Sequence, residues 1–268
     1  MERLSALVLR VIGENPGPMT LAGTNTYIVG SGRHRVLIDT SDGNPRYLQR
    51  LESCLALEGI ERIDSILITH GHWDHVGGVS ALQARWGVTV FKKPGVLDPP
   101  DFVPLKDHMI IKCQGATLRV VETPGHCADH VAFLLEEEKA CFIGDCVLGV
   151  GSAVFDDFYE YMRSLAKVSS LEGLGRLYPG HGPVVEEGKL KIEEYIKHRV
   201  ERESQILRVL ESRGALPLEE IVRVVYPSLE SNLFKAASGN VVHHLEKLVK
   251  DDRVVLDDSG RWNLKPTL

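Results

Sequence analysis

One segment, SILITHGHWDHVGG at residues 65–78, constrains the fold of this 268-residue chain more than any other feature. An apolar strand-like run leads directly into His70, His72, Asp74 and His75. Side chains at positions i and i+2 of an extended backbone point the same way, and the next two ligand-type residues turn aside as a helix begins. Burying these polar groups without a metal ion would leave several of them without partners. The segment therefore predicts a metal site, against the alternative of a solvated histidine-rich turn.

Three further ligand-type residues follow later in the chain. His126 lies in the turn TPGHCADH, Asp145 follows the apolar run CFIG, and His181 lies between glycines in LYPGHGP. Loops at strand ends are common places for functional side chains. Five imidazoles and two carboxylates are enough for two divalent ions if one carboxylate bridges them. Nitrogen and carboxylate ligands without thiolates favour zinc, so we expect two Zn²⁺ per chain, with Mn²⁺ as a substitute in assays.

The cysteines are expected to be reduced thiols, because five is an odd number and their spacing matches no disulfide framework. Cys127 directly follows His126 and Cys146 directly follows Asp145, so a thiolate ligand has to be weighed. Neighbouring side chains on an extended segment point to opposite faces, and the ligand set is complete without sulfur. We expect these two residues to be small apolar fillers. The remaining cysteines are Cys54, Cys113 and Cys141.

Charge and hydropathy restrict the partners of the chain. The net charge of −6 arises in residues 1–186, with 17 basic and 23 acidic residues, since residues 187–268 contain 14 of each kind. This balance favours a packing or homo-dimerisation role for the C-terminal part over DNA reading, which needs a basic stripe. No stretch approaches the ~18 consecutive apolar residues of a membrane span, and the start shows no secretory signal. We therefore expect an intracellular protein with no membrane association.

Residues 1–186 predict a strand-rich α/β domain in which helices cover two packed sheets. Gly and Pro clusters such as NPGP, GSG and TPG separate the elements. Helical periodicity is expected at Arg46–Leu57, Val79–Trp86 and Tyr159–Val168. Strands are expected at Leu7–Ile12, Asn25–Val29, Val36–Ile38, Ser65–Thr69, Val88–Phe91, Leu118–Val121, Val131–Leu135 and Cys141–Gly144.

Residues 187–268 predict a helical linker followed by a winged-helix-like domain. A long amphipathic helix at 188–213 precedes shorter helices at 218–225 and 233–250. The end, RVVLDDSGRWNL, alternates around Ser259-Gly260 in the manner of a hairpin with a two-residue turn. The order helix, helix, hairpin is that of a winged helix.

The motifs HxHxDH, a later GH, an Asp after an apolar strand and a final PGH resemble the metal motifs of the metallo-β-lactamase superfamily. This resemblance implies an αββα sandwich and a dinuclear zinc hydrolase. It also implies that one zinc is held by His70, His72 and His126, the other by Asp74, His75 and His181, with Asp145 as the bridge. An intact ligand set of this kind argues against a non-catalytic binding protein.

Roles for three further residues are predicted from the resemblance or from their positions in the sequence. Asp39, in VLIDT, matches an aspartate that orients a ligand histidine, although Ser41 stands where many members have glycine. The resemblance gives Asp74 a catalytic role in receiving or relaying a proton. His130, four residues after His126, is expected to make structural hydrogen bonds rather than to act in catalysis.

A nearly end-to-end resemblance is to the β-lactamase-like protein 2 group, zinc endoribonucleases that act on single-stranded RNA in mitochondria. It is carried by NPGPMTLAGTNTYIVG (15–30), VFDDFYEYMRSL (154–165) and the winged-helix-like tail. It implies an endoribonuclease that cleaves single-stranded RNA by attack of a metal-bound hydroxide, located in the mitochondrial matrix or otherwise the cytosol. However, TLxGTNTY and the tail also resemble fungal acyl-carrier-protein thioesterases. The alternative is therefore a hydrolase of small-molecule thioesters, of the glyoxalase II or acyl-carrier-protein thioesterase type.

Single-stranded RNA is usually bound by basic grooves and stacking aromatic rings. Aromatic residues at helical spacing are more often part of a hydrophobic core than of a binding site, so the alternative for each candidate is a core position. The candidates for RNA contact are Tyr27, Phe155, Phe158, Tyr159 and Tyr161, with Arg163 nearby.

Overall fold

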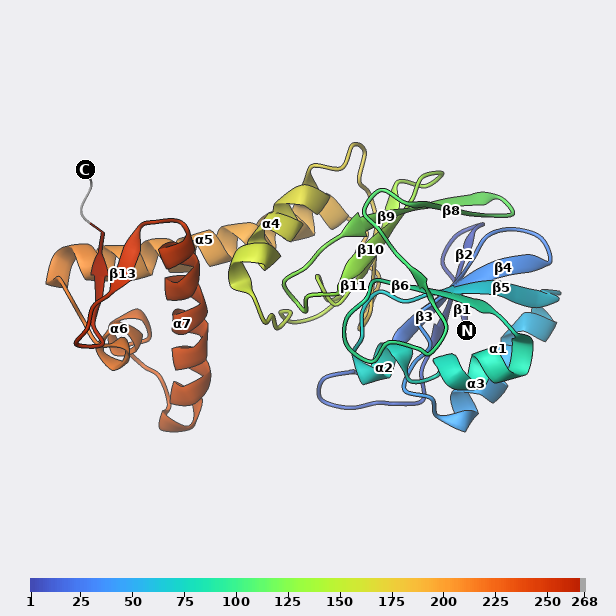
Figure 1. Ribbon diagram of the computed structural model, residues 1–268, viewed down its shortest axis with the longest axis horizontal. Coiled ribbons are helices and arrows are strands. Elements are labelled where there is room, and N and C mark those ends of the chain that lie inside the picture. Colours follow the sequence, from blue (N-terminus) through green and yellow to red (C-terminus); the bar gives the residue numbers. More distant parts are fainter. Residues whose placement is uncertain (266–268) are drawn as a thin grey trace.

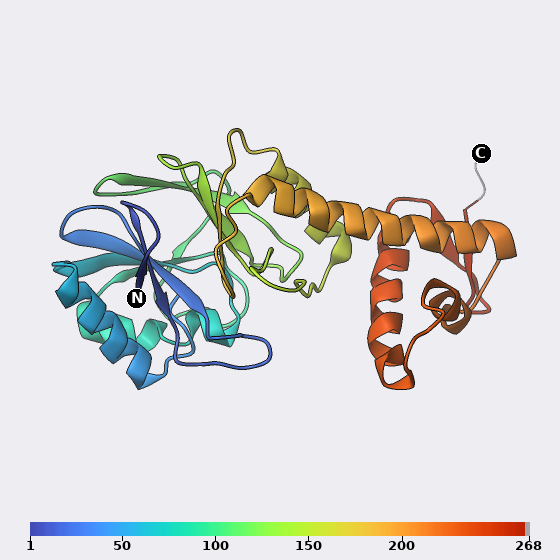
Figure 2. The ribbon, with the colours of Figure 1, turned by 180° about the vertical axis from the view of Figure 1, so that it is seen from behind.

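Two β-sheets face each other in the N-terminal part of the chain, and helices cover their outer faces (Figure 1). This arrangement is the expected αββα sandwich. The computed structural model describes residues 1–265. A smaller helical unit lies at the far end of one long helix, α5 (Gly188–Arg213), well away from the first sheet (Figure 2).

The first sheet changes from antiparallel to parallel pairing across its width. Within the described residues it has seven strands, paired in chain order from β1 to β7. Pairing is antiparallel up to β4 and parallel from β4 to β7, so each parallel pair needs a crossover connection, which is helical between β4 and β5 and between β5 and β6 and a loop between β6 and β7. The helices are α1 (Pro45–Leu57), α2 (Trp73–Val76) and α3 (Val79–Trp86). The strands are β1 (Glu2–Arg3), β2 (Val8–Ile12), β3 (Asn25–Val29), β4 (His34–Ile38), β5 (Arg62–Leu67), β6 (Thr89–Lys92) and β7 (Val103–Pro104).

The second sheet has the order β12-β11-β10-β9-β8 within the described residues. Its outer face is covered by α4 (Phe158–Ser169). Asp157 caps the start of this helix, because its carboxylate accepts hydrogen bonds from the backbone N–H groups of Tyr159 and Glu160. Only the β11–β12 pair is parallel among these pairings. The strands are β8 (Ile110–Cys113), β9 (Ala116–Glu122), β10 (Val131–Leu135), β11 (Ala140–Gly144) and β12 (Leu177–Pro179).

The hydrophobic core fills three layers of the sandwich. The middle layer lies between the sheets and contains Phe133, Phe142 and Tyr178. The outer layers join the first sheet to α1 and α3, and the second sheet to α4 and the start of α5. Strands covered on both faces are apolar along their whole length, which is why β10 and β11 appear as uninterrupted apolar runs in the sequence.

The C-terminal unit has its own core and also touches the sandwich. Its core joins the second half of α5 to α6, α7 and the hairpin. Helix α7 lies against the start of α4, where the rings of Phe158 and His244 are 4.4 Å apart and Lys250 Nζ donates to Asp157 Oδ2 at 2.6 Å. The elements are α5 (Gly188–Arg213), α6 (Leu218–Val225), η1 (Ser231–Leu233), α7 (Phe234–Lys250), β13 (Val254–Leu256) and β14 (Trp262–Leu264).

The predicted hairpin is present, but its two-residue turn is wrong. The register pairs Leu256 with Trp262, which leaves a five-residue loop between β13 and β14. Asp257 organises that loop, because its carboxylate accepts from the backbone N–H groups of Ser259 and Arg261, both at 2.9 Å. Ser259-Gly260 therefore lies within a longer turn. In the part of the chain that the structure describes, no helix is both long and apolar enough to cross a bilayer.

Candidate metal centre

The seven predicted metal ligands converge at one edge of the sandwich. After β5, His70 and His72 lie in the loop that leads into α2, and Asp74 and His75 lie in α2 itself, while the others follow β9, β11 and β12 of the second sheet. They form two groups whose candidate ligand atoms lie within 4.8 Å of one another in each group. One group is His70, His72, His126 and Asp145, and the other is Asp74, His75 and His181.

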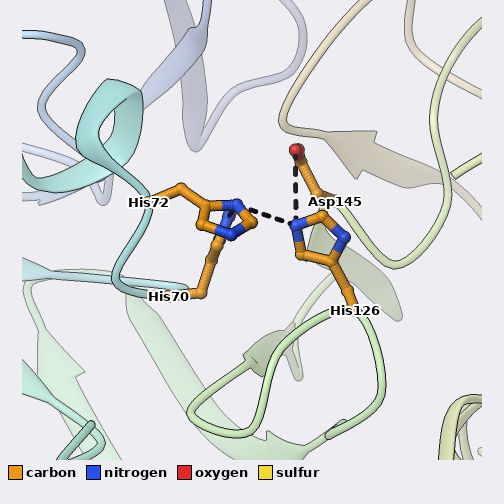
Figure 3. A group of neighbouring side chains, drawn as sticks. All are labelled: His70, His72, His126 and Asp145. Carbon is orange, nitrogen blue, oxygen red and sulfur yellow. Dashed lines mark hydrogen bonds and ion pairs between the residues drawn. The ribbon is translucent and has the colours of Figure 1, made fainter. Parts of the chain in front are cut away.

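In the first group the side chains point toward a common centre (Figure 3). His72 Nδ1 lies 2.9 Å from His70 Nε2 and 3.0 Å from His126 Nε2. Asp145 Oδ2 lies 3.8 Å from His126 Nε2. His72 thus offers its Nδ1 atom, whereas the other two histidines offer Nε2.

In the second group three atoms form a nearly equilateral triangle. His75 Nε2 and His181 Nε2 are 3.4 Å apart, and Asp74 Oδ2 lies 3.3 Å from the first and 3.2 Å from the second. Asp145 approaches this group as well, with Oδ1 3.5 Å from His75 Nε2 and Oδ2 3.3 Å from His181 Nε2. Its carboxylate therefore lies between the two groups.

These distances fit two tetrahedral ions. Ligand atoms about 2.0–2.1 Å from a tetrahedral zinc are separated from one another by roughly 3.3 Å. The triangle of the second group matches that separation, and the contacts of the first group lie on either side of it. Asp145 Oδ1 is buried and has no hydrogen-bond partner among the described residues, as expected of an atom that would coordinate a metal.

Asp39 orients one histidine of each group. Its Oδ2 accepts from His75 Nδ1 at 2.8 Å and from the hydroxyl of Thr69 at 2.8 Å. Since the Thr69 hydroxyl donates to Asp39, it accepts from His70 Nδ1, 3.0 Å away. Both imidazoles therefore carry their proton on Nδ1 and turn an Nε2 lone pair toward the site.

Two other contacts that orient ligands were not predicted from the sequence. His126 Nδ1 donates to the backbone carbonyl of Val154 at 2.7 Å, which fixes its Nε2 as the free atom. The Thr24 hydroxyl donates to Asp74 Oδ2 at 2.9 Å, and Asn15 Nδ2 in turn donates to Thr24. Asn15 and Thr24 both lie in the 15–30 segment, so that motif positions an acidic side chain of the site.

His130 makes structural hydrogen bonds, as expected. Its Nε2 accepts from the backbone N–H of Asp145 at 3.1 Å, and its Nδ1 donates to the Thr123 hydroxyl at 2.8 Å. Burial, followed by the neighbouring His126, lowers the pKa of His130 to about 3, which keeps this imidazole neutral. Gly144 is required beside it because φ is +51° and a Cβ would lie 2.6 Å from His130 Nε2.

In the absence of a metal ion, the carboxylates hold His75 and His181 in their charged forms, whereas burial lowers the pKa of His70 and of His72. Burial opposes ionisation of Asp145, but the charge of His75 and the hydrogen bond from His181 outweigh it and hold the pKa of Asp145 well below its usual value. Burial likewise opposes a charge on His181, yet hydrogen bonds to Asp145 and Asp74 raise its pKa to about 9. A divalent ion would displace the protons that occupy the coordinating lone pairs of these histidines.

The cysteines take no part in either group. Cys127 is buried and donates to Asp129 Oδ1 at 3.1 Å, and burial raises the pKa of the Cys146 thiol to about 12. Neutral thiols of this kind are the expected fillers. All five cysteines are free: Cys54, Cys113, Cys127, Cys141 and Cys146.

The aromatic candidates divide into core and surface residues. Tyr27, Phe158 and Tyr161 are buried in the core. Phe155 and Tyr159 are partly exposed, with Arg163 5.7 Å from the ring of Tyr159. Only the partly exposed rings are available to a substrate.

Known families match both parts of the chain. Residues 19–98 match the model described as the metallo-beta-lactamase superfamily. A "Beta-lactamase-like protein 2 homolog" of Drosophila melanogaster is 45% identical and covers 96% of this chain and 93% of its own length. The chain belongs to the metallo-beta-lactamase superfamily. With its two His/Asp groups, this family member is a metal-dependent hydrolase.

Other relatives extend the likeness over both domains. A homolog with the same description in Caenorhabditis elegans is 40% identical, covering 94% of this chain and 87% of its own length. The crystal structure of a metallo-beta-lactamase family protein of Thermus thermophilus has a TM-score of 0.75 at 24% identity, covering 98% and 100% of the two chains. Residues 218–262 match the beta-lactamase associated winged helix domain. The winged-helix expectation is confirmed.

Proposed function

We propose that this hydrolase is an endoribonuclease that cleaves single-stranded RNA and uses two zinc ions. The observation that carries the proposal is the likeness to the β-lactamase-like protein 2 homologs, which runs through both the catalytic and the winged-helix parts of the chain. The sequence motifs that resemble the ribonuclease group lie in both parts too. The same resemblance supports a mitochondrial location, with the cytosol as the alternative.

The geometry is suited to attack on a phosphodiester. Two divalent ions held here would supply a nucleophile at neutral pH and stabilise negative charge on the phosphate oxygens. The residues of the chain position that chemistry: Asp145 lies between the groups, and Asp39 fixes the tautomers of His70 and His75. In this proposal Asp74 receives the proton released from the attacking water. The Thr24 hydroxyl holds its partly exposed carboxylate, and hydrogen bonds from His181 and His75 outweigh burial and lower its pKa, so that the carboxylate is ionised before it accepts the proton.

A single strand is the favoured substrate because it can bend a phosphate down to the metal centre. A stiff A-form duplex presents its backbone on a convex surface and offers fewer conformations to the enzyme. His72 is exposed beside buried His70 and His126, so the first group is open to solvent on one side. A flexible chain can approach from that side.

Thioester hydrolysis is the second candidate, since an acyl carbon can be attacked by the same chemistry. The motif TLxGTNTY, which contains Thr24, resembles the fungal thioesterases as well as the ribonucleases. The metal centre alone does not separate these substrates, because it acts on the reacting atom and not on the rest of the molecule.

The test compares wild type and His72→Ala, both with measured metal content, on labelled single-stranded RNA, duplex RNA and thioesters of glutathione and coenzyme A. We expect wild type to cut the single strand, to leave duplex largely intact, and to lose this activity in His72→Ala. Equal trace cleavage of RNA by both proteins, with rapid thioester hydrolysis by wild type alone, would replace the ribonuclease with the thioesterase.

A further inference from the structure

A cavity of about 370 Å³ lies between the loop that precedes α4 and the helices α5 and α7. Two arginines and three histidines line it, and none of the described lining residues is acidic. The basic residues are Arg199 and Arg202 of α5, His198 beside them, and His243 and His244 of α7. A concave site with this composition suits an anion.

Arg199 is a buried cation that has no counter-ion among the described residues. Only 7% of the residue is exposed, its Nη2 donates to the Ser152 hydroxyl at 3.1 Å, and its buried Nε has no hydrogen-bond partner in the same part of the chain. Its guanidinium lies 5.0–5.5 Å from the ring centroids of Phe155, Tyr161 and Tyr195. Glu203, one turn further along α5, is paired with Lys247 instead. Buried charges are normally paired, so this arrangement is incomplete without an anion.

His244 and Tyr226 complete the wall of the cavity around the two arginines. The Nδ1 atom of His244 is buried without a partner in the described part of the chain. Burial, followed by the charges of Arg199 and Arg202, lowers the pKa of His244 to about 3, so this imidazole is neutral and the arginines are the cations of the cavity. Arg202 lies 4.2 Å from the ring centroid of Tyr226, which forms a half-buried planar surface at the cavity wall. Arginine and aromatic faces of this kind are the surfaces on which nucleic-acid bases stack.

The cavity adjoins the metal centre through one loop. Ser152, Ala153, Val154 and Phe155 form its wall, and the Val154 carbonyl is the group that accepts from His126 Nδ1 at 2.7 Å. A strand that extends from the metal centre along this loop would meet the basic wall with a neighbouring part of its backbone. The winged-helix domain supplies the opposite wall, from α7.

We propose that this inter-domain cavity binds a backbone phosphate of the substrate RNA that flanks the one being cut, with Arg199 and Arg202 as its ligands and Tyr226 as a stacking surface. The assignment of RNA rests on the proposed function. The same cavity would also suit the phosphates of coenzyme A in a thioester substrate. A coenzyme A thioester therefore serves as a second arm of the test.

The test uses Arg202→Gln, because Arg202 is only partly buried and its loss should leave the fold intact. Arg208→Gln is the matched control, since it removes the same charge from an exposed position of α5 outside the cavity. Binding of a fluorescent single-stranded oligoribonucleotide is measured by anisotropy in the His72→Ala background over a range of salt concentrations. Cleavage by the corresponding single variants is measured separately.

We expect Arg202→Gln to weaken RNA binding about tenfold and to raise KM for RNA. The slope of log K against log salt concentration should fall by about 1, the contribution of one phosphate contact. Arg208→Gln should bind within about twofold of its parent. Equal binding and equal salt slopes in the two variants would overturn the cavity assignment even if wild type cleaves RNA. If wild type cleaves no RNA, and Arg202→Gln instead raises KM for a coenzyme A thioester but not for a glutathione thioester, the RNA occupant is wrong and the cavity holds the coenzyme phosphate.

Discussion

At the scale of single residues, Asp39 shows how one buried side chain can organise two metal groups. Its carboxylate reaches His75 directly and His70 through Thr69. The backbone of Asp39 has φ +58° and that of Ser41 has the same value, a conformation that costs an ordinary residue about 1–2 kcal/mol. The turn after β4 is therefore strained, and its left-handed backbone conformation brings the Asp39 carboxylate next to the ligand histidines.

The roles of the two carboxylates lead to a first prediction. Asp145→Ala should abolish turnover and reduce bound metal, because Asp145 lies between both groups. Asp39→Ala should lower activity by about 10–100-fold, the usual effect of losing a residue that orients a ligand. Activity and metal content are measured on both variants. Comparable losses in two equally folded proteins would contradict the separate roles.

Ser41 provides a second prediction, on stability. Ser41→Gly should raise the free energy of unfolding by about 0.5 kcal/mol, because glycine adopts a positive φ without strain but loses more conformational entropy on folding. The Ser41 hydroxyl contributes little, since its distances to Asn15 and Asp42 are both 3.4 Å. Ser41→Ala is the control, because it retains the strain. Denaturation that shows equal stabilities for the glycine and alanine variants would exclude backbone strain as the cause.

At the scale of elements, α5 belongs to two cores. Ile192 and Tyr195 in its first half pack against the second sheet and α4, whereas Ile206 and Leu210 in its second half belong to the winged-helix domain. The helix therefore does more than link the domains predicted at 1–186 and 187–268. Figure 2 shows it running from the sandwich to the smaller unit.

The two halves of α5 should be separable by mutation. Ile192→Ala and Ile206→Ala each remove a fully buried side chain and should each cost about 2–5 kcal/mol. Hydrogen exchange should locate the loss in α4 and β11 for the first variant, and in α6 and α7 for the second. If both variants loosen the same elements, α5 transmits strain as one rigid unit and the division is wrong.

The packing of α7 on α4 predicts a dependence of stability on pH. The pKa of buried His244 is about 3 in the folded protein and about 6.5 in an unfolded chain. As the pH falls below 6.5, the unfolded state binds a proton at His244 that the folded state does not bind. The free energy of unfolding therefore decreases toward acid pH. The loss between pH 7.5 and pH 5 should reach up to about 2 kcal/mol.

The measurement is denaturation of wild type and His244→Gln at both pH values. The variant should lose less stability on acidification, because glutamine does not titrate. Parallel pH profiles for the two proteins would assign the acid sensitivity to other groups.

Elements with strong local signals could be predicted from the sequence, and elements defined by distant partners could not. Helical periodicity predicted the position of α5, the apolar run predicted β10, and the compact motif at residues 70–75 contains four of the seven ligands. The short strands β1, β7, β8 and β12 have weak patterns and exist because a neighbouring strand pairs with them. Val154 acts through a backbone carbonyl, which carries no sequence signature. Arg199 becomes notable only once the fold leaves its buried Nε without a partner among the described residues.

At the scale of the whole molecule, the metal centre joins the two sheets. His70, His72, Asp74 and His75 follow a strand of the first sheet, whereas the remaining residues of both groups follow strands of the second. Each group therefore takes side chains from both halves of the sandwich. Metal ions bound there would cross-link the halves, while the described part of the winged-helix domain contributes no residue to either group.

Removing the metal should therefore destabilise the sandwich and leave the winged helix unaffected. We expect about two zinc ions per chain by elemental analysis, and a lower unfolding temperature of the sandwich after chelation, restored by adding zinc. A ligand at 1,000 times its Kd stabilises the state that binds it by about 4 kcal/mol.

The winged helix is an internal control, because its core around Val241 and Leu245 lies outside both groups. Hydrogen exchange distinguishes the parts: protection should fall in β5 and β11 and stay constant in α7. Carefully prepared protein that contains no transition metal, takes none up and unfolds identically with and without chelator would refute the metal centre. Equal loss of protection in α7 would show instead that the domains unfold as one unit.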